Sequence, residues 1–186
     1  GYDHHFGKDR EGSLQTLSKM AEAGHFTYEV VQEQHVGTQQ LSSSRIRKIL
    51  QQEGDVSLVK ELLGRSYSLS GTVIHGEKRG RKIGYPTANI QVENPKKVIP
   101  KSGVYAVDVR LDGMNYSGMM NIGHTPTFQF RSLPSLEVHL FDFHRDIYGK
   151  RLELIFKKRI RDEQRFEGVE GLVEQLKKDA AIAKGL

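Results

Sequence analysis

The residues with the clearest chemical potential lie between Gly76 and Asn89, in the sequence G-E-K-R-G-R-K-I-G-Y-P-T-A-N. Three glycines in this stretch let main-chain N–H groups approach and surround an anion. Its four lysines and arginines are the side chains that bind phosphate oxygens. The hydroxyl of Thr87 and the amide carbonyl of Asn89 are oxygen ligands of the kind that Mg²⁺ accepts. The segment therefore predicts binding of a nucleoside triphosphate and a phosphoryl-transfer reaction.

Thr87 and Asn89 follow the predicted phosphate-binding loop, Gly76–Gly84, almost directly. Since both side chains are neutral, they would hold Mg²⁺ weakly alone, and we expect the metal to arrive with ATP and to be completed by its phosphates. The alternative is that Pro86 and Thr87 form only a turn and that Asn89 is a strand-edge residue. The candidate ATP- and phosphate-binding residues are Gly76, Lys78, Gly80, Arg81, Gly84, Thr87 and Asn89, and the candidate metal ligands are Thr87 and Asn89.

Glu137 is the candidate general base, because its carboxylate interrupts the otherwise apolar segment Leu136–Leu140. In a strand, alternation places Glu137 and His139 on one face and the three apolar side chains on the other. With the apolar face on the core, Glu137 is aimed at the opposite side, where a partly desolvated carboxylate is suited to general-base work. The alternative is an ordinary glutamate on the solvent-facing side of a strand.

The composition is that of an ordinary water-soluble chain of 186 residues, enough for one domain or for one domain and part of another. The apolar fraction is 37%, and no apolar run approaches the roughly 20 residues that a membrane helix needs. The first residues lack the basic start and apolar stretch of a signal peptide. There is no cysteine, which excludes disulfides, thiolate metal sites and a cysteine nucleophile. Together these features predict a cytoplasmic protein without a membrane partner.

The formal net charge is +5, and the excess of basic residues is gathered in two places, Lys78–Lys82 and Lys157–Arg161. A basic chain suits anionic partners such as ATP or nucleic acid. For the second cluster, the alternative is a solvated surface without a partner.

The pattern of elements changes near Gly64 and Arg65. Before that point we expect three helices, at 13–23, 44–53 and 56–63. We also expect one short strand at 28–31. We expect Gly24, Gly54 and Gly64 to end the three helices and Asp55 to cap the third.

After Gly64 the pattern is one of alternating strands with short turns. Asp112-Gly113 lies between two such runs and predicts a hairpin. A helix over 169–184 closes the chain, with an apolar stripe expected to pack on the strands. Strands without intervening helices predict an antiparallel barrel or sandwich. The predicted strands are 66–74, 104–111, 115–122, 136–141 and 152–160.

Several segments between residues 66 and 186 resemble the sequence motifs of riboflavin kinases. They occur in the order of that family: G-R-K-I-G-Y-P-T-A-N at 80–89, N-x-G with P-T-F at 121–128, E-x-H at 137–139, and R-D-E-Q-R-F at 161–166, with the final helix to Asp179.

The resemblance implies an ATP:riboflavin 5′-phosphotransferase on a six-stranded antiparallel barrel with a C-terminal helix. It implies Glu137 as the base that takes the proton of the ribityl 5′-hydroxyl, and Mg²⁺ bound with ATP by Thr87 and Asn89. Arg165 and Phe166 are then expected near the flavin. The implied ligands are riboflavin, FMN, ATP and ADP, without a nucleic acid.

The first part of the chain is similar to the second half of the FMN adenylyltransferase module of bifunctional FAD synthetases. We therefore expect residues 1–65 to be the back half of an α/β domain of nucleotidyltransferase type, and 66–186 to be a riboflavin kinase domain. The H-x-G-H motif of that module is expected upstream of Gly1, so that adenylyl transfer belongs to a longer parent protein. The implied adenylyltransferase residues are Asp3, Ser42, Ser43, Ser44 and Arg47.

Two other functions stay open from the sequence. One is a nucleic-acid-binding barrel that uses the two basic clusters, which would have no need for Pro-Thr-Ala-Asn or for Glu137. The other is a flavin-binding module without catalysis, against which Thr87, Asn89 and Glu137 argue. The sequence does not predict the oligomeric state.

Overall fold

The computed structural model describes residues 5–30, 35–36, 39–76, 79–124 and 134–186, in two compact units, 1–42 and 43–186. The first unit contains a 3₁₀ turn η1 (Lys8–Arg10), helix α1 (Leu14–Glu22) and the short strand pair β1 (His35–Val36) and β2 (Gln39–Gln40). Helix α1 confirms the predicted helix. The predicted strand at 28–31 is wrong for residues 28–30, which have no regular structure, and Val31 lies outside the described residues.

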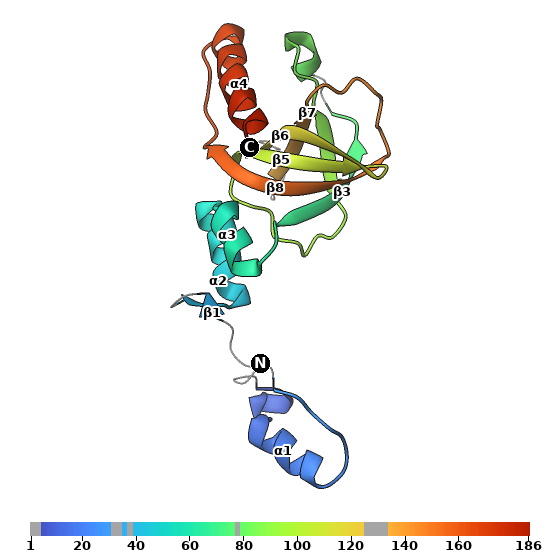
Figure 1. The fold of residues 1–186 in the computed structure, drawn as a ribbon, viewed down its shortest axis with the longest axis vertical. Helices are drawn as coiled ribbons and strands as arrows, with labels where there is room; N and C mark the ends of the chain where they lie inside the picture. Colours follow the sequence, from blue (N-terminus) through green and yellow to red (C-terminus); the bar gives the residue numbers. More distant parts are fainter. Residues whose placement is uncertain (1–4, 31–34, 37–38, 77–78, 125–133) are drawn as a thin grey trace. The chain divides into compact units, whose positions relative to one another are not determined.

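The second unit contains a closed barrel of six antiparallel strands (Figure 1). The strands are neighbours in the order β3–β4–β7–β6–β5–β8, and β8 closes the ring by pairing with both β5 and β3. A closed ring has no open edge at which another chain could add a strand. The strands are β3 (Ser68–Ile74), β4 (Ala88–Val92), β5 (Gly103–Leu111), β6 (Met114–His124), β7 (Pro134–Leu140) and β8 (Arg151–Arg161).

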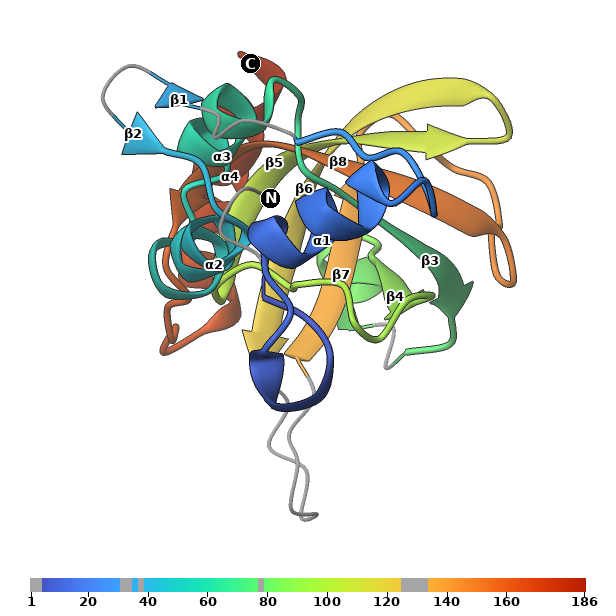
Figure 2. The same ribbon diagram turned by 90° about the horizontal axis from the view of Figure 1, so that it is seen from below.

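The barrel confirms the architecture that the resemblance implied, and the Asp112-Gly113 turn joins β5 to β6 as predicted. Strand β4 is the one strand of the barrel that the pattern analysis missed, and the short strands β1 and β2 of the first unit were not predicted either. Strand β4 lies between β3 and β7 (Figure 2) and alternates Ala88, Ile90 and Val92 with two polar residues. This alternation was overlooked because the segment Gly76–Asn89, which overlaps the start of β4, was interpreted as ligand-binding.

Burial along β7 alternates as predicted. Leu136, Val138 and Leu140 are buried, whereas Glu137 and His139 are half-exposed on the opposite face. The period of two in a strand therefore fixes the direction of Glu137 once its apolar neighbours enter the core.

Residues 43–63 form a helical pair that belongs to the second unit. Helix α2 (Ser43–Lys48) runs into a π-helical turn η2 (Ile49–Glu53), which the sequence did not predict, and Gly54 follows with φ +70°. Asp55 caps α3 (Val56–Leu63) as predicted, because its Oδ1 accepts the Ser57 and Leu58 N–H groups at 3.1 and 2.9 Å. Helix α3 packs against β8.

The compact unit that holds the barrel begins at Ser43, before the boundary of 65/66 that the sequence pattern suggested. The physical reason is that the helical pair buries its apolar face on the barrel, and that the Lys101 N–H donates to the Leu50 carbonyl at 2.8 Å. The assignment of residues 1–65 to an adenylyltransferase domain stays a prediction. The buried side chains of the pair are Ile49, Leu50, Val56, Val59 and Leu62.

Tyr105 and Arg159 form the contact beneath Gly54. Tyr105 is fully buried and donates its hydroxyl proton to the Lys101 carbonyl at 2.5 Å, and burial raises the pKa of this phenol. A side chain at Gly54 would collide with the Tyr105 hydroxyl and the Arg159 Nε. Arg159 also donates to Asp162 Oδ1 at 2.7 Å, which lowers the pKa of that carboxyl. The helical pair is thus anchored at the end of β8.

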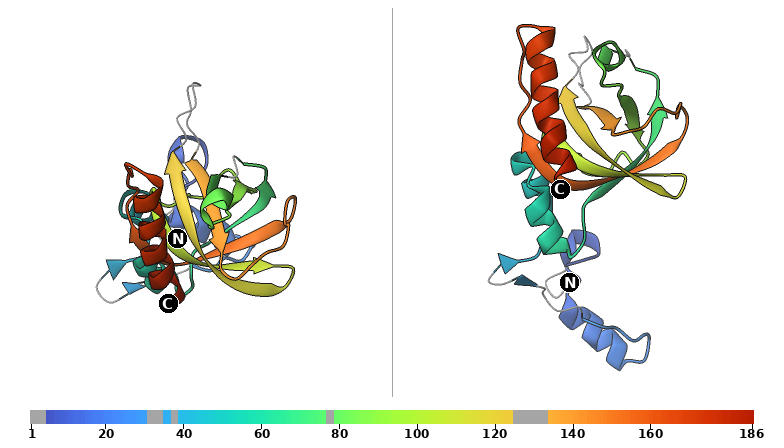
Figure 3. Two further views of the ribbon diagram at one scale, coloured as in Figure 1. Left: turned by 90° about the horizontal axis from the view of Figure 1, so that it is seen from above. Right: turned by 45° about the horizontal axis from the view of Figure 1, so that its top comes forward.

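Helix α4 (Val169–Lys184) lies along the outside of the barrel, against β5, β6 and β8 (Figure 3). Its predicted apolar stripe makes this contact, where Ala183, Leu176 and Ala180 pack with Met119 and Phe141 of the barrel. Among the described residues, none of the helices combines the length and the apolar character that crossing a membrane requires.

A buried ion pair joins α4 to β8. Asp179 is fully buried, and Arg161 donates to it from Nε at 3.0 Å to each oxygen and from Nη2 at 2.7 Å. Gln175 adds a fourth hydrogen bond at 2.9 Å. Because burial makes the loss of one partner costly, this pair fixes where the helix lies on the barrel.

We expect Asp179→Asn to lower the free energy of unfolding by about 3 kcal/mol, since it leaves the Arg161 guanidinium without its counter-charge. Urea denaturation of the chain measures this. Glu174→Gln on the same helix is the matched control, because Glu174 pairs with Lys178 at the exposed surface. No measurable loss is expected there, and equal losses in the two variants would contradict a special role for the buried pair.

Candidate active site

A hydrogen bond between Thr87 and Glu137 joins the two most informative sequence motifs. The Thr87 hydroxyl, one residue before β4, donates to Glu137 Oε2 on β7 at 3.0 Å. Residues 50 positions apart meet here because β4 and β7 are neighbours in the barrel. A hydroxyl that donates its proton to a carboxylate keeps its oxygen lone pairs for another partner, such as a cation.

Asn89 lies directly opposite Glu137 in the β4–β7 ladder. Its side-chain amide packs on the main chain of Gly76, where any side chain would collide with it. Gly80 has a similar role, since a side chain there would collide with the Tyr85 carbonyl. These two glycines therefore allow the loop to lie close to the start of β4. The cradle for an anion that the sequence predicted in this loop stays a prediction.

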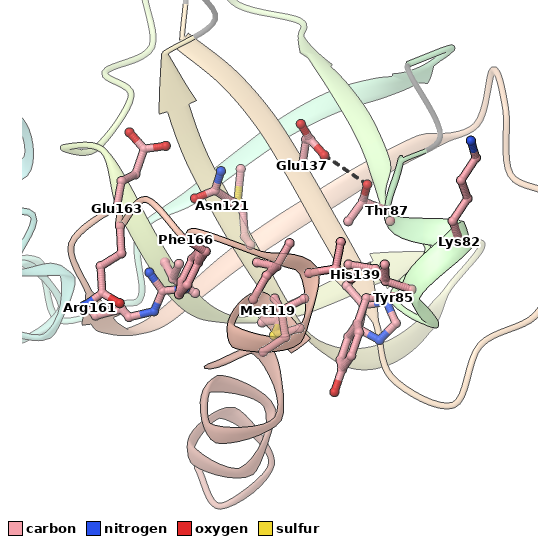
Figure 4. A pocket seen from close by; sticks show the side chains of 18 residues that line it. Lys82, Tyr85, Thr87, Met119, Asn121, Glu137, His139, Arg161, Glu163 and Phe166 are labelled. Atoms are coloured by element: carbon pink, nitrogen blue, oxygen red, sulfur yellow. Dashed lines mark hydrogen bonds between the residues drawn. The ribbon is translucent and has the colours of Figure 1, made fainter. Parts of the chain in front are cut away.

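A cavity of about 600 Å³ opens beside the Thr87–Glu137 pair (Figure 4). One part of its lining is polar, with Lys82 and Asn121 in addition to that pair. Another part is apolar and comes from Met119 and the segment that leads into α4 (Figure 4). The apolar residues of the lining are Ile83, Val104, Met119, Met120, Phe166, Val169, Leu172 and Leu176.

The buried ion pair supports the apolar part of this cavity. The Arg161 guanidinium lies 5.8 Å from the centre of the Phe166 ring, and both residues line the cavity. Arg161 thus holds Phe166 on one side and Asp179 on the other. A cavity with an apolar wall, an aromatic ring and a few polar groups has the character of a site for a flat organic ligand.

A second cavity, of about 430 Å³, lies on the other side of the loop. Its lining includes Arg81 and the segment Phe143–Tyr148 between β7 and β8. The Tyr148 ring stacks on His75 with centroids 4.0 Å apart, which ties this segment to the start of the glycine-rich loop. Thr87 lines both cavities, and the loop contributes Gly80 and Lys82 to the larger one and Arg81 to the smaller one.

The predicted site residues thus gather in part. Gly80, Thr87, Glu137 and Phe166 line the larger cavity, and Asn89 faces Glu137 in the ladder. Gly76, Gly84 and Arg165 were also predicted but are not in the lining of either cavity. Gly76 packs on Asn89. Gly84 is an exposed turn residue with φ +81°, and the side chain of Arg165 is exposed. Lys78 and Asp3 lie outside the described residues, Ser42 precedes α2, and Ser43, Ser44 and Arg47 are on α2.

Mg²⁺ has no acidic cluster to bind to in the described part of the chain, where no group of three or more histidines and carboxylates comes together. The donors near the loop are the Thr87 hydroxyl, the Asn89 amide and the Glu137 carboxylate. This set fits a cation that arrives with phosphates and takes one or two protein ligands.

Sequence reasoning missed most of the cavity walls. Lys82 lies within the basic loop but was not among the predicted site residues. Arg161 and Glu163 were noted only as members of the R-D-E-Q-R-F motif, without a role in a binding site. The 143–148 segment carried no signal, although its run of aromatic and charged residues, F-H-R-D-I-Y, is unusual for a turn between strands.

The sequence model of the riboflavin kinase family matches residues 63–186. The chain belongs to the riboflavin kinase family. The bifunctional riboflavin kinase/FMN adenylyltransferase of Listeria monocytogenes is 45% identical over 179 residues, which are 96% of this chain and 56% of that protein. The protein of the same name from Bacillus subtilis is 43% identical over 183 residues, with the same two shares.

A crystal structure of a protein named as a macrolide-efflux protein from Streptococcus pneumoniae has the same fold, with a TM-score of 0.84 and 36% identity. The match covers all of this chain and 59% of that one. The chain thus spans little more than half the length of the relatives that it matches. The region that matches the riboflavin kinase family, residues 63–186, contains the whole barrel and its motifs.

Proposed function

We propose that this chain transfers the γ-phosphate of ATP to the 5′-hydroxyl of riboflavin and so forms FMN. The observation that supports this most directly is the Thr87–Glu137 hydrogen bond, at a residue that lines both cavities. A candidate base and a candidate ligand of Mg-ATP are thereby within contact of one another, as transfer between two bound substrates requires.

In this proposal the larger cavity takes riboflavin. Its volume of about 600 Å³ is within the range of small-molecule sites. The apolar wall with Phe166 suits the three-ring isoalloxazine, and the polar part with Asn121 and Glu137 suits the hydroxyls of the ribityl chain. The ribityl end is then the part of the ligand nearest to Thr87.

The smaller cavity takes ATP in this proposal. Arg81 and Arg145 bring positive charge to it, and Phe143 and Tyr148 offer aromatic rings to a purine. The γ-phosphate is then directed to Thr87, where Mg²⁺ bound to the phosphates is met by Thr87 and Asn89. The metal is part of the nucleotide substrate and supplies charge neutralisation to the transferring group.

Glu137 accepts the proton of the ribityl hydroxyl in this mechanism. A bond forms between that oxygen and the γ-phosphorus, the bond from phosphorus to the bridging oxygen of ADP breaks, and the proton passes to the carboxylate. Since Oε2 already accepts the Thr87 hydroxyl, we assign the proton to Oε1. Lys82 and the glycine-rich loop stabilise the negative charge of the phosphates.

The relatives' names support a wider proposal for the parent protein, which would also adenylylate FMN to FAD in the cytoplasm. The predicted adenylyltransferase residues Ser43, Ser44 and Arg47 lie together on α2. The nucleic-acid-binding alternative finds little support in the second basic cluster, since Lys157, Arg159 and Arg161 pair with carboxylates of the same barrel unit.

The proposed reaction is tested by incubating the chain with riboflavin and Mg-ATP and separating the flavins by chromatography. We expect FMN to form, and Glu137→Gln to lower the rate by roughly 10²-fold or more with ATP binding nearly unchanged. Riboflavin that binds without conversion would instead indicate a non-catalytic flavin module. Near-normal turnover by Glu137→Gln would remove Glu137 from the base role.

Asn89→Ala is expected to weaken Mg-ATP binding more than riboflavin binding, because Asn89 is proposed to meet the cation that ATP brings. Isothermal titration with each substrate measures the two losses separately. Equal losses would point to a disturbed fold, which Asn89 could cause through its contact with Gly76.

Phe166→Ala is expected to weaken riboflavin binding about tenfold, because it removes an aromatic ring from the apolar wall. Quenching of flavin fluorescence measures this. Arg165→Ala is the matched control, since Arg165 is adjacent in sequence but exposed and outside both cavities. A loss in Arg165→Ala as large as in Phe166→Ala would mean that the flavin binds elsewhere.

A further inference from the structure

Thr87 lies beside the shortest strand ladder of the barrel, the one between β4 and β7. The β4–β7 ladder consists of the pairs Ala88↔Val138 and Asn89↔Glu137, whereas the β5–β6 ladder extends over the whole of β5. Thr87 precedes the first of these pairs, so main-chain pairing with β7 does not set its distance from Glu137. Something else must hold the segment before β4 in place.

His139 makes a contact from β7 that helps to hold this segment, beside the Thr87–Glu137 bond. Its Nδ1 is 2.7 Å from the carbonyl oxygen of Pro86, the residue before Thr87. A carbonyl can only accept a hydrogen bond, so Nδ1 must carry the proton and donate it. The Pro86 carbonyl therefore fixes the tautomer of a neutral His139 ring as Nδ1–H.

Two half-exposed residues of β7 thus contact two successive residues of the segment before β4. Alternation places Glu137 and His139 on one face, and their partners are Thr87 and Pro86. The His139 ring is itself held, because Tyr85 and Phe141 lie edge-on to it with centroids 5.2 and 5.7 Å away. The imidazole is therefore packed between the segment before β4, at Tyr85, and the end of β7, at Phe141.

We propose that His139 is a positioning residue of the phosphoryl-transfer reaction, which sets the place of Thr87 relative to Glu137 by donating Nδ1–H to Pro86. This inference rests on the proposed function. His139 does not accept or donate the reacting proton in it. Its effect is on alignment, where displacements of the order of 1 Å change rates up to about 10²-fold.

Two variants separate this role from simple packing. The side chain introduced by His139→Asn can present an amide N–H close to the place of Nδ1, whereas His139→Leu fills space without a donor. We expect His139→Leu to lower kcat about tenfold or more, with KM for riboflavin and for ATP within about twofold of the wild-type values. We expect His139→Asn to retain kcat within about threefold of wild type.

The result that would overturn the inference is equal kcat in the two variants, whether both are fast or both are slow. His139 also lines the larger cavity. A loss in His139→Leu that appears in KM for riboflavin alone would therefore also overturn the inference, since His139 would then act only as a wall of that cavity. Thermal melting of both variants confirms that the compared proteins are folded at the assay temperature.

A second measurement does not depend on activity. Long-range ¹H–¹⁵N correlation spectra of histidine rings distinguish a proton on Nδ1 from one on Nε2, and the signal of His139 is the one lost in His139→Asn. We expect a protonated Nδ1, and an Nδ1 without a proton would overturn the inference. If wild type fails to form FMN, the proposed function fails, and this spectrum still decides whether His139 holds Pro86.

Discussion

The contact on which the site depends is the joint between β4 and β7. Their ladder is short, yet it joins two neighbours in the closed barrel and brings Asn89 and Glu137, which come from distant parts of the chain, into direct opposition. A long ladder between β4 and β7 is not needed for this, because β4 is also paired with β3 and β7 is also paired with β6. The side-chain bond from Thr87 to Glu137 then completes an arrangement that the main chain only brings close. A joint of this kind is fixed in position and still leaves a cavity on each side of Thr87.

The apolar wall of the larger cavity has a different support. Helix α4 follows the last strand and would be free to lie in several positions on an apolar barrel surface, since apolar contacts are not directional. The Arg161–Asp179 pair is directional, and it is fully desolvated on the Asp179 side. A well-packed apolar pair could be as stabilising, but it would not fix the helix or hold the Phe166 ring through the same guanidinium. The ion pair therefore contributes to the shape of the cavity more clearly than to stability.

Local patterns in the sequence were sufficient for much of the fold. Alternation in β7, the Asp112-Gly113 turn and the cap at Asp55 each act over a few residues, and each formed as predicted. Strand β4 was missed because its residues were assigned to ligand binding, although the same residues do both. The pairing of β4 with β7, and hence the Thr87–Glu137 bond, depends on contacts 50 residues apart and was not predicted. The resemblance to a family implied only that Thr87 and Glu137 belong to one site. The second cavity was not foreseen, because the contact between His75 and Tyr148 that brings its wall to the loop has no local signal.

The two cavities meet at Thr87, a neutral residue, and the charges around it give a reason for this. Thr87 and Asn89 carry no charge, so a cation gains little from them until the phosphates of a nucleotide are present. The basic side chains lie in the loop, with Lys82 toward one cavity and Arg81 toward the other. Among the described residues Glu137 forms no ion pair with the loop, and its hydrogen-bond partner is the hydroxyl of Thr87. The neutral Thr87 therefore holds the Glu137 carboxylate in place without bringing a charge of its own to the joint.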